Sequence, residues 1–188
     1  MVEGRSLNGV DLLVWVATLL AFPLAGLAAR AVVGPVDAVW TAALAGAIAG
    51  AVIGAAQWLA LRRIGADLRW IAATAVGLAV GLALAFAIFG YGDSVGDLAV
   101  VGAVSGLGVG IAQWWLLRAF VGGSLVWLWV PASAVFWALG WTVTTAIGVD
   151  PDQRWAVPGL SGSTTLTVLL GGVLWILARP GQPERTSG

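Results

Sequence analysis

Two glutamines are the polar side chains best placed to bind a solute in an otherwise apolar chain. Gln57 and Gln113 each stand near the end of a hydrophobic segment that closes with an arginine. Within lipid, an amide can form a hydrogen bond to a neighbouring helix, which contributes roughly 0.6 and at most about 2 kcal/mol. The alternative is that both amides line a cavity and bind a solute there. A third, weaker copy of the segment has Leu174 in this place, so we expect structural glutamines rather than a site of three equal amides.

Three arginines end these segments and form the second candidate for chemistry. They are Arg62, Arg118 and Arg179, and each follows a tryptophan by one helical turn. A ring of three guanidinium groups would attract anions or lipid phosphates, because arginine binds phosphate through two hydrogen bonds at once. The simpler interpretation is that each side chain extends to the headgroups at its own helix end and fixes the topology. We favour that simpler interpretation.

Glycines precede the first two copies at every fourth position. They are Gly46, Gly50 and Gly54, followed by Gly102, Gly106 and Gly110, whereas the third copy has Ser163, Thr167 and Gly171 in these places. At about 100° per residue the glycines share one face of a helix, and the glutamine falls on that face. Small residues every fourth position let helices approach closely in lipid. We therefore expect the six glycines of the first two copies to lie at helix–helix contacts.

The composition indicates a protein that lies in a lipid bilayer, and it excludes several kinds of chemistry. Of 188 residues, 60% are hydrophobic and 10% are charged, whereas a soluble domain carries roughly 25% charged residues. The chain has no Cys and no His, which excludes thiol nucleophiles, imidazole catalysis and the common transition-metal ligands. A formal net charge of zero argues against a nucleic-acid partner. We expect no enzyme activity, no cofactor and no metal.

Six apolar segments are long enough to cross the hydrocarbon core of a bilayer, which takes about 20 helical residues. They cover approximately residues 10–33, 38–61, 70–89, 97–117, 125–147 and 159–178. Asp37 and Asp97 are the expected N-caps of the second and fourth helices. Arg30, near the end of the first helix, is an expected partner for Asp37. Five hydroxyl residues make the start of the sixth helix the most polar segment, namely Ser161, Ser163, Thr164, Thr165 and Thr167.

The helices are predicted to form three similar hairpins. A tryptophan precedes a glycine at the same spacing in each odd-numbered helix, in the pairs Trp15–Gly26, Trp70–Gly81 and Trp129–Gly140. The repeats span about residues 10–63, 67–119 and 125–180 of a single membrane domain, 1–188, whose last residues, 181–188, are a polar tail. A unit of two helices returns the chain to the same side, so the units are parallel and related by a pseudo-threefold axis along the membrane normal. The predicted fold class is thus an all-α membrane protein with six transmembrane helices.

The distribution of arginines predicts the orientation, since cytoplasmic loops carry an excess of positive residues. On the N-terminal side fall Arg5, Arg62, Arg63, Arg69, Arg118, Arg179 and Arg185, and on the opposite side Arg30 and Arg154. Both termini are therefore expected in the cytoplasm. The same side collects tryptophans that we expect to form an interfacial aromatic belt, namely Trp15, Trp58, Trp70, Trp114, Trp115, Trp127, Trp129 and Trp175.

The repeated helix ends, Gln57–Arg62 and Gln113–Arg118, resemble those of small bacterial integral membrane proteins of uncharacterised function. The resemblance implies no activity. Three parallel hairpins are also similar in number to those of mitochondrial carriers, but the Pro-x-Asp-x-x-Lys/Arg signature of that family is absent. We expect a multi-pass protein of the bacterial inner membrane.

Two functions from different classes are consistent with these features. The leading one is a non-catalytic packing, scaffold or lipid-binding accessory protein, whose partners are the lipid bilayer and either another membrane protein or a second copy of the chain. The rival is a channel or transporter for a small neutral solute or an anion, for which the Ser, Thr and Gln faces and the arginines at one mouth are suitable. No acidic residue is predicted at mid-membrane depth, which disfavours proton or cation coupling.

Overall fold

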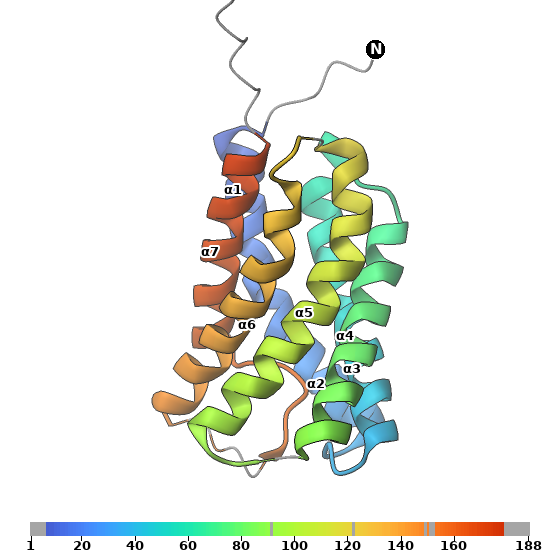
Figure 1. Ribbon diagram of the computed structural model, residues 1–188, viewed down its shortest axis with the longest axis vertical. Coiled ribbons are helices and arrows are strands. Elements are labelled where there is room, and N and C mark those ends of the chain that lie inside the picture. Colours follow the sequence, from blue (N-terminus) through green and yellow to red (C-terminus); the bar gives the residue numbers. More distant parts are fainter. Residues whose placement is uncertain (1–6, 91, 122, 149, 151–152, 179–188) are drawn as a thin grey trace, which may run out of the picture.

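The computed structural model describes residues 7–90, 92–121, 123–148, 150 and 153–178, and these form an all-helical bundle (Figure 1). Among the described residues, six helical spans are long and apolar enough to cross a membrane, which supports the predicted multi-pass membrane protein. Their bounds are Gly9–Val33, Val39–Ile64, Arg69–Phe89, Val95–Phe120, Val126–Ala146 and Leu160–Leu177. The predicted segments agree with these spans to within a few residues.

Three of the spans combine an α-helix with a short 3₁₀ turn. The first consists of α1 (Gly9–Ala17), a turn over Thr18–Leu20 and α2 (Ala21–Val33). The second is α3 (Val39–Leu61) with a turn over Arg62–Ile64, and the fifth is a turn over Val126–Leu128 followed by α6 (Trp129–Ala146). The others are single helices, α4 (Arg69–Phe89), α5 (Val95–Phe120) and α7 (Leu160–Leu177).

Both predicted aspartate N-caps are wrong, although each aspartate lies close to the true cap. Ser94 caps α5, because its hydroxyl accepts a hydrogen bond from the backbone N–H of Asp97 at 3.0 Å. The Asp97 carboxylate accepts from the Ser94 hydroxyl at 2.6 Å and from the Ser94 backbone N–H at 3.3 Å, so the aspartate is the third helical residue of a capping box. At α3, the hydroxyl of Thr41 accepts from the backbone N–H of Ala38 at 2.8 Å, and Asp37 precedes the cap.

The helices follow one another around a closed ring. Each span packs against the next along the chain, and α7 completes the ring by packing against α1 and the turn after it. Helix α1 begins and α7 ends at the same end of the bundle, the upper end in Figure 1. We call this end the arginine end, after Arg62, Arg63, Arg69 and Arg118, and the opposite end the aspartate end, after Asp37, Asp93, Asp97 and Asp150.

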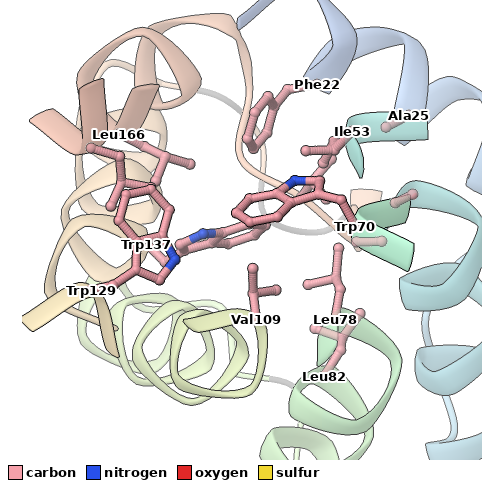
Figure 2. Close-up of a cluster of buried hydrophobic side chains, with 14 of the residues drawn as sticks. Phe22, Ala25, Ile53, Trp70, Leu78, Leu82, Val109, Trp129, Trp137 and Leu166 are labelled. Atoms are coloured by element: carbon pink, nitrogen blue, oxygen red, sulfur yellow. The ribbon is translucent and has the colours of Figure 1, made fainter. Parts of the chain in front are cut away.

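Bulky side chains fill the space between the helices. Trp15, Trp70, Trp129 and Trp137 are among the largest fully buried residues. Figure 2 shows Trp70, Trp129 and Trp137 pointing into the centre of the bundle with aliphatic side chains around them. The interior near the arginine end is therefore occupied by indole rings.

This arrangement corrects the predicted aromatic belt. Trp15, Trp70 and Trp129 leave at most 1% of their surface exposed and belong to the core. Trp115 and Trp127 are the members that face outward, with 60% and 55% exposed. An indole has a large apolar body and one N–H donor, so it is equally suited to an interface and to a core that offers an acceptor. Such an acceptor is present in this core.

Candidate functional site

Gln57 and Gln113 meet inside the bundle. The Gln113 Nε2 donates to the Gln57 Oε1 at 2.8 Å, which joins α5 to α3. The same nitrogen donates to the Thr74 hydroxyl of α4 at 2.9 Å, and that hydroxyl donates to the backbone carbonyl of Trp70 at 2.8 Å. Both glutamines are buried, with 5% and 1% of their surface exposed. Three helices are thus connected through two amides and one hydroxyl.

Two tryptophans complete this cluster and orient its amides. The indole N–H of Trp70 donates to the Gln57 Oε1 at 3.2 Å, and that of Trp129, in α6, donates to the Gln113 Oε1 at 3.1 Å. An indole nitrogen can only donate, so each amide must present its oxygen to the tryptophan. We call Gln57, Trp70, Thr74, Gln113 and Trp129 the amide cluster. It places both amides against neighbouring helices, where each makes hydrogen bonds to protein groups.

In the third copy of the motif, the buried tryptophan donates to a backbone carbonyl and not to an amide side chain. Leu174 in α7 is fully buried, and Trp15 of α1 takes a backbone acceptor instead. Its indole N–H donates to the Thr167 carbonyl at 2.9 Å. These three buried tryptophans therefore each donate across a helix contact, two to a glutamine and one to a main-chain carbonyl.

The glycines face the backbones of neighbouring helices. A Cβ added at Gly46 would lie 2.7 Å from the Leu78 carbonyl oxygen, and one at Gly50 would lie 2.7 Å from the same atom of Thr74. On α5, the corresponding Cβ atoms at Gly102 and Gly106 would meet carbonyl oxygens of α6 at 2.7 and 2.5 Å. Gly54 and Gly110 lie against the side chains of Thr74 and Ser133, where an added Cβ would come within 2.9 Å of the Cβ atom. No side chain fits at these positions unless a helix moves.

The described arginines of the predicted ring lie on the outside of the arginine end. The guanidinium of Arg62 lies over the Trp58 ring at 5.8 Å, and that of Arg118 lies 3.6 Å from the Trp115 ring centroid. Both arginines are exposed. Each therefore stacks on a tryptophan of its own helix, an arrangement that favours a cation near the headgroup region. Arg179 and the tail 181–188 lie outside the described residues.

Arg30 has a different partner from the one predicted. Its guanidinium donates to the backbone carbonyl of Gln153 and lies 5.5 Å from the centre of the Trp155 ring. The segment before α7 folds back over the end of α2, which places Trp155 rather than Asp37 beside the arginine. The prediction of an Arg30–Asp37 pair is therefore wrong.

The hydroxyl cluster at the start of α7 mostly bonds to its own helix. Ser163 and Thr164 both donate to the Leu160 carbonyl, at 2.9 and 2.8 Å, and Thr165 donates to the Ser161 carbonyl at 3.2 Å. A hydroxyl that bonds one turn back has used its single donor on its own helix. In the described part of the chain, no group of three His, Cys, Asp or Glu residues is placed to hold a metal ion.

Two features escaped the sequence analysis. The first is the set of side chains that hydrogen-bond to the amides, Trp70, Thr74 and Trp129, for which a signal existed. The spacing from Trp70 to Gly81 is about three helical turns, so both must share a face. The second is Asp11, which is 5% exposed and forms a capping box with Asn8 at the start of α1. The pattern Asn-x-x-Asp was the available signal there.

Comparison of the chain with protein-family models, curated proteins and solved structures finds no match in any of the three.

Proposed function

We propose that this chain is a non-catalytic packing, scaffold or lipid-binding accessory protein of the bacterial inner membrane. In this proposal, three parallel two-helix units surround a pseudo-threefold axis, and both termini lie in the cytoplasm. Support for the repeat comes from matching contacts, because Gln57 meets Trp70 as Gln113 meets Trp129. Support for the orientation comes from Arg62, Arg63, Arg69 and Arg118 at the arginine end, against Arg30 and Arg154 at the opposite end.

The amide cluster is the observation that carries the proposal. A channel or transporter needs polar groups that are available to a solute along a path through the bundle. Here Gln57 and Gln113 are buried, hydrogen-bonded to each other and to two indoles, and packed among large apolar side chains. A solute would have to displace these contacts to use the amides, so the interior favours packing over transport.

Solute flux through vesicles tests this proposal against its rival. The purified chain is reconstituted into phospholipid vesicles, and permeation of glycerol, urea and chloride is followed by stopped-flow light scattering and a chloride-sensitive dye. We expect the rates of protein-free vesicles. Flux above that level that disappears in Gln57→Leu or Gln113→Leu, with helicity retained, would show that the amides serve transport and would overturn the proposal.

A further inference from the structure

The ring of helices closes where α1 and the turn after it pack against α7, and this closing contact differs from the others. Among the described residues it is the least extensive contact between neighbouring spans. Elsewhere in the ring, a Cβ added at Gly50, Gly77 or Gly106 would lie 2.7, 2.7 or 2.5 Å from a carbonyl oxygen of the next helix. At Gly171 of α7 the nearest atom belongs instead to the Trp15 ring, at 2.8 Å. Side chains therefore separate the backbones of α1 and α7 at this glycine.

Among the described residues, one short hydrogen bond joins α1 to α7. The Trp15 indole N–H donates to the Thr167 carbonyl at 2.9 Å. A second bond, from the Ser163 hydroxyl to the Leu19 carbonyl, is long at 3.4 Å, and the single proton of that hydroxyl also points to the Leu160 carbonyl at 2.9 Å. The Thr167 hydroxyl is buried and has no partner within the described residues. The indole therefore supplies the main directional attraction across the closing contact.

The first span is interrupted at the level of this contact. Its two helices meet at the 3₁₀ turn Thr18–Leu20, which is interior to the span, whereas the turns of the second and fifth spans lie at a span end. Pro23 has no N–H to donate to the Leu19 carbonyl four residues back, and in a regular helix its ring would clash with that carbonyl. A 3₁₀ stretch within a helix often marks a hinge, and proline is a usual cause of a kink. The turn is thus a suitable pivot for α1.

On the other side of the turn, α2 makes little contact with α7. A mostly apolar cavity of about 300 Å³ lies there, at the aspartate end, and its lining includes Phe22 and Gly26 of α2, Trp141 of α6 and Trp155 before α7. Leu27, which also lines it, is 57% exposed on the outside of the bundle. The first span is therefore held to α7 mainly through α1 and the turn.

We propose that the ring opens laterally between α1 and α7, with α1 moving about the turn Thr18–Leu20. In the closed conformation, Trp15 is buried and donates to α7. In the open conformation the facing surfaces of α1 and α7 contact lipid acyl chains, while the glycine contacts of the other helices keep their packing. This lateral gate goes beyond the proposed scaffold function, because it gives the bundle a second conformation with different surfaces toward the bilayer.

Distances between spin labels test the opening. The chain has no Cys, so labels attach only at introduced cysteines. The pair Leu13→Cys and Ile176→Cys spans the closing contact, and the control pair Leu59→Cys and Val76→Cys spans the glycine contact of α3 with α4. These side chains face outward, with 49–70% exposed. The full chain is placed in phospholipid nanodiscs and measured by double electron–electron resonance. We expect two distances across the closing contact and one across the control.

Removal of the indole donor should favour the open conformation. Trp15→Phe keeps an aromatic ring and should raise the fraction of the longer distance about threefold, the effect of one average hydrogen bond between membrane helices. Trp70→Phe is the matched control, because it removes the corresponding donor to Gln57 from a contact packed through glycines. It should leave a single distance in the control pair. Pro23→Ala restores an N–H opposite the Leu19 carbonyl and should abolish the longer distance by stiffening the pivot.

Three results would overturn this inference. The first is a single narrow distance between Leu13 and Ile176 in both the parent and Trp15→Phe. The second is a longer distance that persists in Pro23→Ala with helicity retained, which would exclude the turn as the pivot. The third is equal broadening in the control pair, which would indicate a loosely packed bundle without a gate. None of these results depends on solute flux, so the gate and the scaffold function are refuted by different measurements.

Discussion

Replacing Gln113 by leucine should destabilise the bundle more than the same replacement at Gln57. Gln113 makes three side-chain hydrogen bonds, to Gln57, Thr74 and Trp129, whereas Gln57 makes two, to Trp70 and Gln113. Both substitutions keep a side chain of similar size. Each leaves one buried indole N–H without its acceptor, a penalty of about 1–3 kcal/mol that is common to the two variants.

The difference between the variants therefore depends on one hydrogen bond. Such bonds between membrane helices average about 0.6 kcal/mol, with a maximum of about 1.7. Gln113→Leu should consequently melt about 2 °C below Gln57→Leu, since 1 kcal/mol shifts the midpoint by about 2–4 °C in a chain of this size. The double variant should cost about 0.6 kcal/mol less than the sum of the single variants, because the bond between the two glutamines is lost in both.

Equilibrium unfolding in detergent, followed by far-ultraviolet circular dichroism, measures all four proteins of this cycle. Leu174→Ile is a suitable reference for a conservative change at the third equivalent position, which has no amide. Additive costs in the double variant, or a larger cost at Gln57 than at Gln113, would show that the amides do not share the contact described above.

Three further predictions follow from the contacts and the charge distribution. Gly50→Leu and Gly106→Leu should each lower the free energy of unfolding by at least about 1–3 kcal/mol, the cost typical of overpacking, because backbone atoms block the added side chain. Gly172→Leu should melt like the parent, because a Cβ at Gly172 meets nothing within 4 Å. Equal melting of all three variants would place Gly50 and Gly106 at lipid. Topology reporters should read cytoplasm after Arg63, Gly123 and Gly188 and outside near Gly92 and Asp152, and a periplasmic signal after Gly123 would contradict the parallel repeat. The Arg69 side chain donates to Asp67 and holds the pKa of that carboxyl below its ordinary value of 3.8, so its stabilisation is present above about pH 4 and is lost as the pH falls through the lowered pKa. Both side chains are exposed, so Asp67→Asn should change the melting temperature at neutral pH only slightly, and a large drop would refute the exposed placement.

The sequence by itself determined the features that depend on local pattern. Hydropathy over about 20 residues locates a membrane span whatever its neighbours are, and all six spans were predicted in this way. Periodicity put Gln57 on the same face as Gly46, Gly50 and Gly54, because a helix has the same geometry of about 3.6 residues per turn in any context. That face proved to be the one that meets α4.

Only the tertiary structure decided what each face meets. An indole is suited to the interface and to the core alike, so the inward direction of Trp70 and Trp129 depended on an acceptor supplied by another helix. The partner of Arg30 likewise depended on a distant segment, Gln153 and Trp155, that folds back over α2. Contacts between residues far apart in the chain decide such choices, and a pattern within one helix carries no information about them.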